Sequence, residues 1–223
     1  MARSTELAEG GVGLISGGLD STVVAAGMMQ KYDRQFFMFA AYGQKTLGRE
    51  LVAFRALCEH YQPTDSIVVD LGFLPKVGKS ALFDSSQPLT ALNRKSEYVP
   101  FRNAILLGAA VAWAETVSAG GVLIGSTGGD RTCPDNSTAF INAFQAVVNE
   151  GTMTDRPINV VAPLIELDKA GVIKRGLELN APFELSWSCH NNLGSIACGA
   201  CSNCEARRGS YVSLGLEDPI QYE

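Results

Sequence analysis

The chain has 223 residues, of which 46% are hydrophobic and 18% are charged, and its formal net charge is −5 at pH 7. This apolar content excludes a disordered chain and predicts one folded α/β domain with a small appended segment. The negative charge argues against a large nucleic-acid interface, because basic side chains supply most of the affinity for a phosphate backbone. No run reaches the roughly 18 to 20 apolar residues of a membrane span, and the N-terminus lacks the apolar core of a secretory signal, so we expect a cytoplasmic protein.

Short apolar runs alternate with segments of helical periodicity along most of the chain. The predicted strands are 11–15, 36–42, 67–71, 121–125 and 158–162, and the predicted helices are 19–31, 48–60, 101–117, 138–148 and, capped by Asp168, 168–179. Segment 72–98 shows little periodicity and is predicted to be a long loop of the kind that often forms a lid. The alternation predicts βαβ units and a parallel sheet that binds its ligands beyond the carboxyl ends of its strands.

The string Ser-Gly-Gly-Leu-Asp-Ser-Thr joins the first predicted strand to the first predicted helix. Glycines let the backbone approach an anion closely, and the free N–H groups of a helix N-terminus attract it. Asp20 would repel a phosphate unless Mg²⁺ lay between them. A simple turn with a capping serine is the alternative, but the whole string favours a phosphate site that differs from a Walker loop, since the Gly-Lys-Ser/Thr ending is missing. The predicted phosphate-binding residues are Ser16, Gly17, Gly18, Leu19, Asp20, Ser21 and Thr22.

Four of the six cysteines lie close together near the end of the chain, at Cys189, Cys198, Cys201 and Cys204. The spacing C-x8-C-x2-C-x2-C can close a tetrahedral thiolate shell around Zn²⁺ without an open position for substrate, so a structural zinc is predicted. Cytosolic disulfides are disfavoured, whereas an iron–sulfur cluster, a redox Cys-x-x-Cys pair and His190 as a replacement ligand are alternatives. We therefore expect residues 1–180 to form an ATP-binding domain and residues 181–223 to form a zinc-binding segment packed on it.

The glycine-rich string resembles the pyrophosphate loop of the adenylating PP-loop ATP pyrophosphatases. Together with the cysteine spacing, it makes the chain resemble the 7-cyano-7-deazaguanine synthase (QueC) family over nearly its whole length. Residues 42–44, 99–103, 163–164 and 167–169 resemble further segments of that family. The resemblance implies an adenine nucleotide alpha hydrolase-like fold, a homodimer, and conversion of 7-carboxy-7-deazaguanine to the nitrile with ATP and ammonia. The carboxylate would be adenylated, converted to an amide by ammonia, activated again and dehydrated.

The resemblance also assigns roles to single residues. Positive charge around the reacting phosphorus is expected from Arg102 and Lys169, although either could instead be an ordinary residue at the start of a helix. The expected catalytic residues are Asp20, Ser21, Arg102 and Lys169. The residues expected beside the adenine or ribose are Tyr42, Gly43 and Gln44. The residues expected to bind the deazaguanine are Arg102, Asn103, Asp130, Cys133 and Asp135. By contrast, Cys58 is expected to lie in the core.

The chain departs from the family pattern in two places. Lys45-Thr46 stands where Arg-His usually follows Tyr-Gly-Gln, and the loop 130–137 lacks the usual aromatic residues and Cys-Arg pair. Because that loop contacts the deazaguanine in the family, one alternative is a ligase that joins a deazaguanine to a protein amine, as in antiviral defence systems. A tRNA-modifying enzyme and a non-catalytic nucleotide sensor are further alternatives. The short acidic chain shows no basic RNA-binding domain, and its retention of Asp20, Ser21 and Lys169 argues against a sensor.

Overall fold

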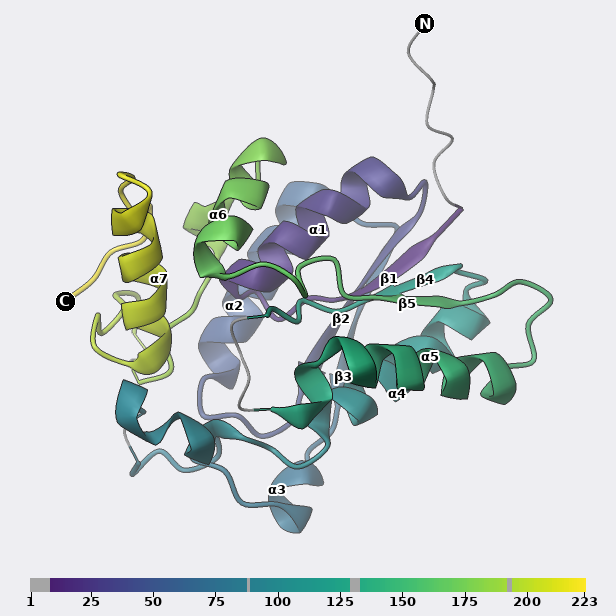
Figure 1. Cartoon of the computed structure of the whole chain (residues 1–223), viewed down its shortest axis with the longest axis horizontal. Coiled ribbons are helices and arrows are strands. Elements are labelled where there is room, and N and C mark those ends of the chain that lie inside the picture. The colour runs from purple at the N-terminus through teal and green to yellow at the C-terminus, as the bar shows by residue number, and fades with distance from the viewer. Residues whose placement is uncertain (1–8, 88, 129–132, 192–193) are drawn as a thin grey trace, which may run out of the picture.

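The computed structural model describes residues 9–87, 89–128, 133–191 and 194–223. Within these ranges, five parallel strands form one sheet in the order β3-β2-β1-β4-β5 (Figure 1). The strands are β1 (Gly11–Leu14), β2 (Gln35–Ala41), β3 (Asp65–Asp70), β4 (Gly121–Leu123) and β5 (Asn159–Val161). The helices are α1 (Leu19–Lys31), α2 (Leu47–Tyr61), α3 (Leu74–Val77), α4 (Arg102–Thr116), α5 (Thr138–Gly151), α6 (Lys169–Glu178) and α7 (Ser202–Ser213), with 3₁₀ turns η1 (Ala91–Glu97), η2 (Pro134–Asn136) and η3 (Phe183–Leu185).

Helices cover both faces of the sheet, and each face has its own hydrophobic core (Figure 1). Successive side chains of a strand point to opposite faces. In β2, Phe37 and Phe39 therefore pack with α1, α2 and α6, whereas Phe36 and Met38 pack with α4 and α5. Burial on both faces explains why the central strands are continuous apolar runs and not alternating patterns.

The strand order fixes where a ligand can bind. The chain runs from β1 to β2 and β3 on one side and then returns to β4 on the other side of β1. The switch point therefore lies between β1 and β4, at their carboxyl ends. The loop that follows β1 carries residues 16–18, and the connection that follows β4 leads to η2.

The predicted alternation of strands and helices is confirmed, with α1 at its predicted bounds. Asp168 caps α6 as predicted, since its Oδ1 accepts a hydrogen bond of 2.7 Å from the backbone N–H of Gly171. The prediction of a long loop over 72–98 is confirmed in part, because the short elements α3 and η1 lie within it. These elements span only four and seven residues, too few for a clear hydrophobic period. No helix in the described ranges is long and apolar enough to cross a membrane.

Helix α7 was not predicted, because the side chains that it buries are mostly polar or cysteine. Its Arg207 is only 1% exposed. The Nε and Nη2 atoms of Arg207 donate to the two carboxylate oxygens of Asp218 at 2.8 and 2.9 Å, and its Nη1 donates to Ser186 Oγ at 2.8 Å. The hydroxyl of Tyr222 donates to Asp218 at 2.6 Å. One buried guanidinium thus joins α7 to the segment after η3 and to the last residues of the chain.

We expect Arg207→Ala to lower the free energy of unfolding by about 3–5 kcal/mol, because it leaves the Asp218 carboxylate buried without its partner. Urea denaturation measures the difference. Arg208→Ala is the matched control on the same helix, since Arg208 is exposed and makes a hydrogen bond of 3.4 Å to the carbonyl of Gly199 and a cation–π contact with Tyr222, but bonds no buried carboxylate. Equal stability of the two variants would contradict the structural role given to Arg207.

Candidate active site and metal site

Residues 16–22 form a compact turn between β1 and α1. The Oγ atoms of Ser16 and Ser21 lie 3.2 Å apart, and Ser16 Oγ also accepts a hydrogen bond of 3.2 Å from the backbone N–H of Gly18. Ser21 Oγ and Thr22 Oγ1 each donate to the carbonyl of Gly18 at 3.0 Å. These bonds gather hydroxyl groups around the N-terminus of α1, where N–H groups attract anions.

Lys169 and Asp20 lie in contact at this turn, although they are 149 residues apart in the sequence. The Nζ atom of Lys169, the first residue of α6, lies 2.7 and 2.6 Å from the two carboxylate oxygens of Asp20. Both side chains are about 70% buried, with exposed fractions of 29% and 28%. Gly125, which follows β4, also lies against this turn, since a Cβ there would be 3.4 Å from the backbone N of Ser21. The structure therefore places a cation and a carboxylate beside the predicted phosphate site.

A second polar cluster forms at the carboxyl end of β2. Arg102 Nη1 lies 3.3 Å from the hydroxyl of Tyr42, and the guanidinium carbon lies 5.4 Å from the centre of the Tyr42 ring. Burial raises the pKa of Tyr42, although the charge of Arg102 opposes this. Burial lowers the pKa of Arg102, but Tyr42, Cys133 and Asp135 outweigh that effect and raise it above its ordinary value. Arg102 is thus a fixed positive charge at this edge of the sheet.

Gln44 braces the segment that holds Tyr42. Its Oε1 accepts a hydrogen bond of 2.9 Å from the backbone N–H of Tyr42, and its Nε2 donates to the carbonyl of Ala40 at 3.1 Å and to Glu50 Oε2 at 3.0 Å. Gln44 is 3% exposed. Gly43 has a φ of +82°, a backbone conformation that favours glycine. Gln44 therefore orients the predicted nucleotide-binding segment with all three of its polar contacts inside the protein.

Two of the residues predicted to bind the deazaguanine, Asn103 and Asp135, are joined by hydrogen bonds at the start of α4. One carboxylate oxygen of Asp135 accepts a hydrogen bond of 2.8 Å from the backbone N–H of Asn103, and the Asn103 side chain donates to the carbonyl of Asp135 at 3.0 Å. Both residues are buried. Cys133 lies close enough to affect the pKa of Arg102. Asp130, also predicted here, lies outside the described residues.

Three residues of this region were missed by the sequence analysis. Burial raises the pKa of Glu50, although its carboxylate accepts hydrogen bonds from Thr46 and Gln44. Arg49 lies over the ring of Trp187, with its guanidinium carbon 4.3 Å from the ring centre and its Nε buried without a hydrogen-bond partner in the described ranges. Ser126, just after β4, also has a buried hydroxyl that makes no hydrogen bond within those ranges. The sequence did hold a signal for these residues. Arg49 and Glu50 lie at the start of a helix and Ser126 follows the end of a strand, and each position is close to a predicted site.

The four cysteines meet as the spacing predicts. The Sγ atoms of Cys189, Cys198, Cys201 and Cys204 all lie within 4.8 Å of one another. Four sulfurs that each lie about 2.3 Å from a zinc ion would be about 3.8 Å apart, and those of Cys198 and Cys204 are 4.0 Å apart. Backbone N–H groups of Cys198, Cys201, Cys204 and His190 point to the sulfurs at 3.3–3.5 Å, as suits thiolates. The donor set fits a closed metal site and leaves no position for a substrate.

Comparisons with known proteins agree with this architecture. A family model described as "Queuosine biosynthesis protein QueC" matches residues 11–215. Two relatives named 7-cyano-7-deazaguanine synthase, from Chlorobium chlorochromatii (strain CaD3) and Chlorobaculum parvum (strain DSM 263 / NCIMB 8327), are 43% and 40% identical. Each match spans 216 residues, which is 94% of this chain and 94% or 95% of the relative.

A solved structure of NMN synthetase from Francisella tularensis shares the fold, with a TM-score of 0.51 over 94% of this chain and 79% of that one. At 15% identity this likeness concerns the fold alone. The parallel sheet with helices on both faces is thus confirmed, as is the resemblance drawn from the phosphate loop and the cysteine spacing. The family model covers most of the chain, and the chain belongs to the QueC family.

Proposed function

We propose that this chain is an ATP-dependent 7-cyano-7-deazaguanine synthase, which converts 7-carboxy-7-deazaguanine to the nitrile with ammonia. The observation that carries the proposal is the Lys169–Asp20 pair beside residues 16–22 at the switch point, in a chain whose relatives of 40–43% identity bear this name. This arrangement offers hydroxyls, helix N–H groups and a lysine to a nucleotide's phosphates.

The phosphates of ATP bind over the N-terminus of α1, against Ser16, Ser21 and Thr22. Asp20 would hold Mg²⁺, whose positive charge would let this carboxylate face the phosphates. Binding therefore breaks the contact between Asp20 and Lys169, and the ammonium group turns to the phosphates instead. Lys169 stabilises the charge that develops as the bond between the α- and β-phosphates breaks. Tyr42 and Gly43 lie beside the adenosine, oriented by Gln44.

The deazaguanine carboxylate binds near Arg102, and one of its oxygens attacks the α-phosphorus with release of pyrophosphate. Ammonia then adds to the acyl carbon, and AMP leaves with that oxygen to give the amide. A second ATP adenylates the amide oxygen, and loss of AMP with the two protons on nitrogen gives the nitrile. Asn103 and Asp135 fix the start of α4 and hence Arg102, so near-attack geometry depends on this cap. Cys133 is proposed to lie beside the same substrate.

Residues 181–223 act as a structural zinc-binding segment on the ATP-binding domain of residues 1–180. Cys189, Cys198, Cys201 and Cys204 would hold the ion, which would supply folding energy to a segment with little apolar core of its own. The enzyme works as a cytoplasmic homodimer on small molecules.

We expect Lys169→Met to lower the rate of pyrophosphate release by about 100- to 1,000-fold, the usual effect of removing one charge-stabilising donor. A coupled pyrophosphate assay with ATP, 7-carboxy-7-deazaguanine and ammonia measures the rate. Lys174→Met on the same helix is the matched control, because Lys174 is exposed. A Lys169→Met enzyme that works at the wild-type rate would exclude the assigned role.

Mass spectrometry of the products tests the whole proposal. With ATP, 7-carboxy-7-deazaguanine and ammonia, we expect the nitrile, with two AMP formed per nitrile because each of its two steps consumes one ATP. An adenylate or amide that goes no further unless a protein amine is added would instead favour the ligase that modifies proteins. The absence of both AMP and product would overturn the proposal.

A further inference from the structure

Residues 79–98, which connect α3 to α4, have a small hydrophobic core separate from the two cores of the sheet. It consists of Ala81, Leu82 and Leu89 together with Val99, which directly follows the segment, and Phe83 packs against it. The polar contacts of this segment with its surroundings therefore decide where it lies. One set of contacts joins it to the connection between β2 and α2, where the backbone N–H of Lys45 donates to the carbonyl of Leu82 at 2.8 Å and Lys45 Nζ donates to that of Gln87 at 2.7 Å.

A second set of contacts joins the segment to the cysteine region. The side-chain amide of Asn191 pairs with the backbone of Leu89 in both directions, accepting from its N–H at 2.8 Å and donating to its carbonyl at 2.8 Å. Asn191 thus holds Leu89 much as a neighbouring strand would hold it. These partners are 102 residues apart in the sequence, so the contact closes a long loop.

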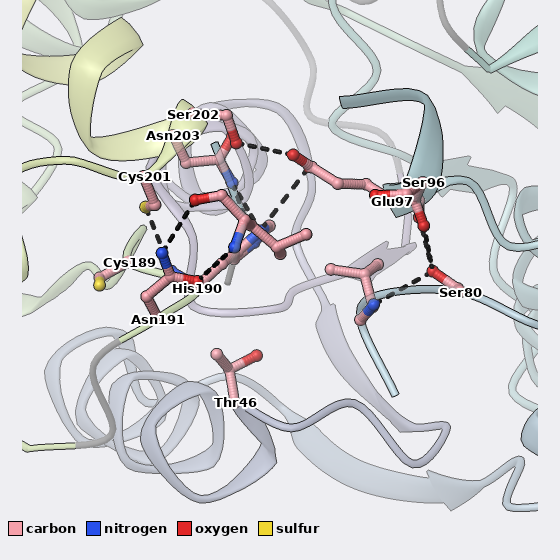
Figure 2. A network of polar contacts seen from close by, with 12 residues as sticks. Thr46, Ser80, Ser96, Glu97, Cys189, His190, Asn191, Cys201, Ser202 and Asn203 are labelled. Carbon is pink, nitrogen blue, oxygen red and sulfur yellow. Dashed lines mark hydrogen bonds and ion pairs between the residues drawn. The ribbon is translucent and has the colours of Figure 1, made fainter. Parts of the chain in front are cut away.

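Glu97 makes a further contact with the cysteine region (Figure 2). Ser202 Oγ donates to Glu97 Oε1 at 2.7 Å, and His190 Nδ1 lies 3.8 Å from Glu97 Oε2. Asn203 Nδ2 lies 2.9 Å from the other ring nitrogen of His190 and so fixes the ring. Ser80 Oγ, at the start of the segment, lies 3.1 Å from the carbonyl oxygens of Ser96 and Glu97 and ties the two ends of the segment together.

All the side chains of the cysteine region that make these contacts lie within two positions of a cysteine. Asn191 and His190 follow Cys189, and Ser202 and Asn203 lie between Cys201 and Cys204. The backbone N–H of His190 also donates to Cys201 Sγ at 3.5 Å (Figure 2). A metal bound by the four sulfurs would therefore also set the distance between Asn191 and Ser202, the two points that hold Leu89 and Glu97.

The other side of residues 79–98 faces the candidate active site. The ring of Phe83 makes an edge contact with that of Tyr42, with 6.2 Å between their centres. The segment leads through Val99 to Arg102, whose backbone N–H donates to the carbonyl of Val99 at 3.3 Å. Displacement of residues 79–98 would thus move a neighbour of Tyr42 and the start of α4 together.

We propose that Asn191 and Glu97 are positioning residues through which the metal-loaded cysteine region orders residues 79–98 and, with them, the Tyr42–Arg102 side of the substrate pocket. The part that concerns the pocket rests on the proposed function, whereas the coupling of the metal to the segment does not.

Hydrogen exchange of the metal-loaded full-length chain tests the coupling without any substrate. In Asn191→Ala, the amides of residues 79–98 are expected to exchange about tenfold faster, as loss of two hydrogen bonds implies. Metal content by elemental mass spectrometry stays at one ion per chain, and exchange in β1, β2 and β4 is unchanged. Ser195→Ala, an exposed position of the same region, is the control and exchanges like the wild type. Removal of the metal with a chelator gives at least the same acceleration in residues 79–98.

Kinetics then tests the link to the pocket. Asn191→Ala is expected to raise the KM for 7-carboxy-7-deazaguanine about tenfold and to lower kcat less, because the pocket wall is displaced while Lys169 and residues 16–22 stay in place. If the wild type is inactive with this substrate, the proposed function is wrong. The hydrogen-exchange result, which concerns only the coupling of the metal to residues 79–98, would still hold.

Two results would overturn the proposal. The first is wild-type exchange of residues 79–98 in metal-loaded Asn191→Ala, and the second is their unchanged exchange after metal removal. If Asn191→Ala loses its metal, Glu97→Ala decides the matter, because Glu97 lies outside the cysteine region. We expect Glu97→Ala to keep its metal and to exchange faster than the wild type in residues 79–98. Wild-type exchange of these residues in Glu97→Ala would also reject the coupling.

Discussion

Gly17 places the predicted phosphate loop, residues 16–22, under a strict steric constraint. Its φ is +79°, and a Cβ there would lie 2.7 Å from that of Ala53 and 2.8 Å from the backbone N of Phe54. Helix α2 therefore presses directly on the loop, and only a glycine fits. From the C-terminal segment, the backbone N–H of Trp187 donates to the carbonyl of Gly17 at 2.8 Å. The groups offered to an anion are thus fixed by two elements distant in sequence, and Arg49, stacked on Trp187, joins those two elements.

The sequence was sufficient to predict whatever depends on local pattern. Apolar runs, helical periods and the cap at Asp168 gave the order of the elements, and the cysteine spacing gave the cluster. The sequence did not predict which polar side chains contact residues far away in the chain, because a local pattern does not identify a distant partner. Gln44 and Asp135 were expected to face ligands, yet Gln44 braces Tyr42 and Asp135 caps α4. Arg207 could not be recognised as buried, since its partner Asp218 lies on a segment without periodicity.

The same reasoning clarifies one departure from the family pattern. Lys45 and Thr46 stand where Arg-His is usual, and both have partners within this chain. Lys45 bonds the carbonyl of Gln87, and Thr46 donates to Glu50 Oε1 at 2.5 Å. The replacement therefore matches the surroundings of these two residues, and it leaves intact the bonds by which Gln44 holds Tyr42.

The position of the C-terminal segment explains why a metal site without an open coordination position would be retained beside an active site. The segment contacts the loop of residues 16–18 through Trp187 and contacts residues 79–98 through Asn191. Its own apolar cluster is small and consists mainly of the cysteines, Ala197 and Trp187, packed against Ala53 of α2. So small a cluster provides little burial free energy, whereas a tetrathiolate ion adds much to folding. An ion bound by the four cysteines would then hold Trp187 and Asn191, and with them the loop of residues 16–18 and residues 79–98, at a fixed distance.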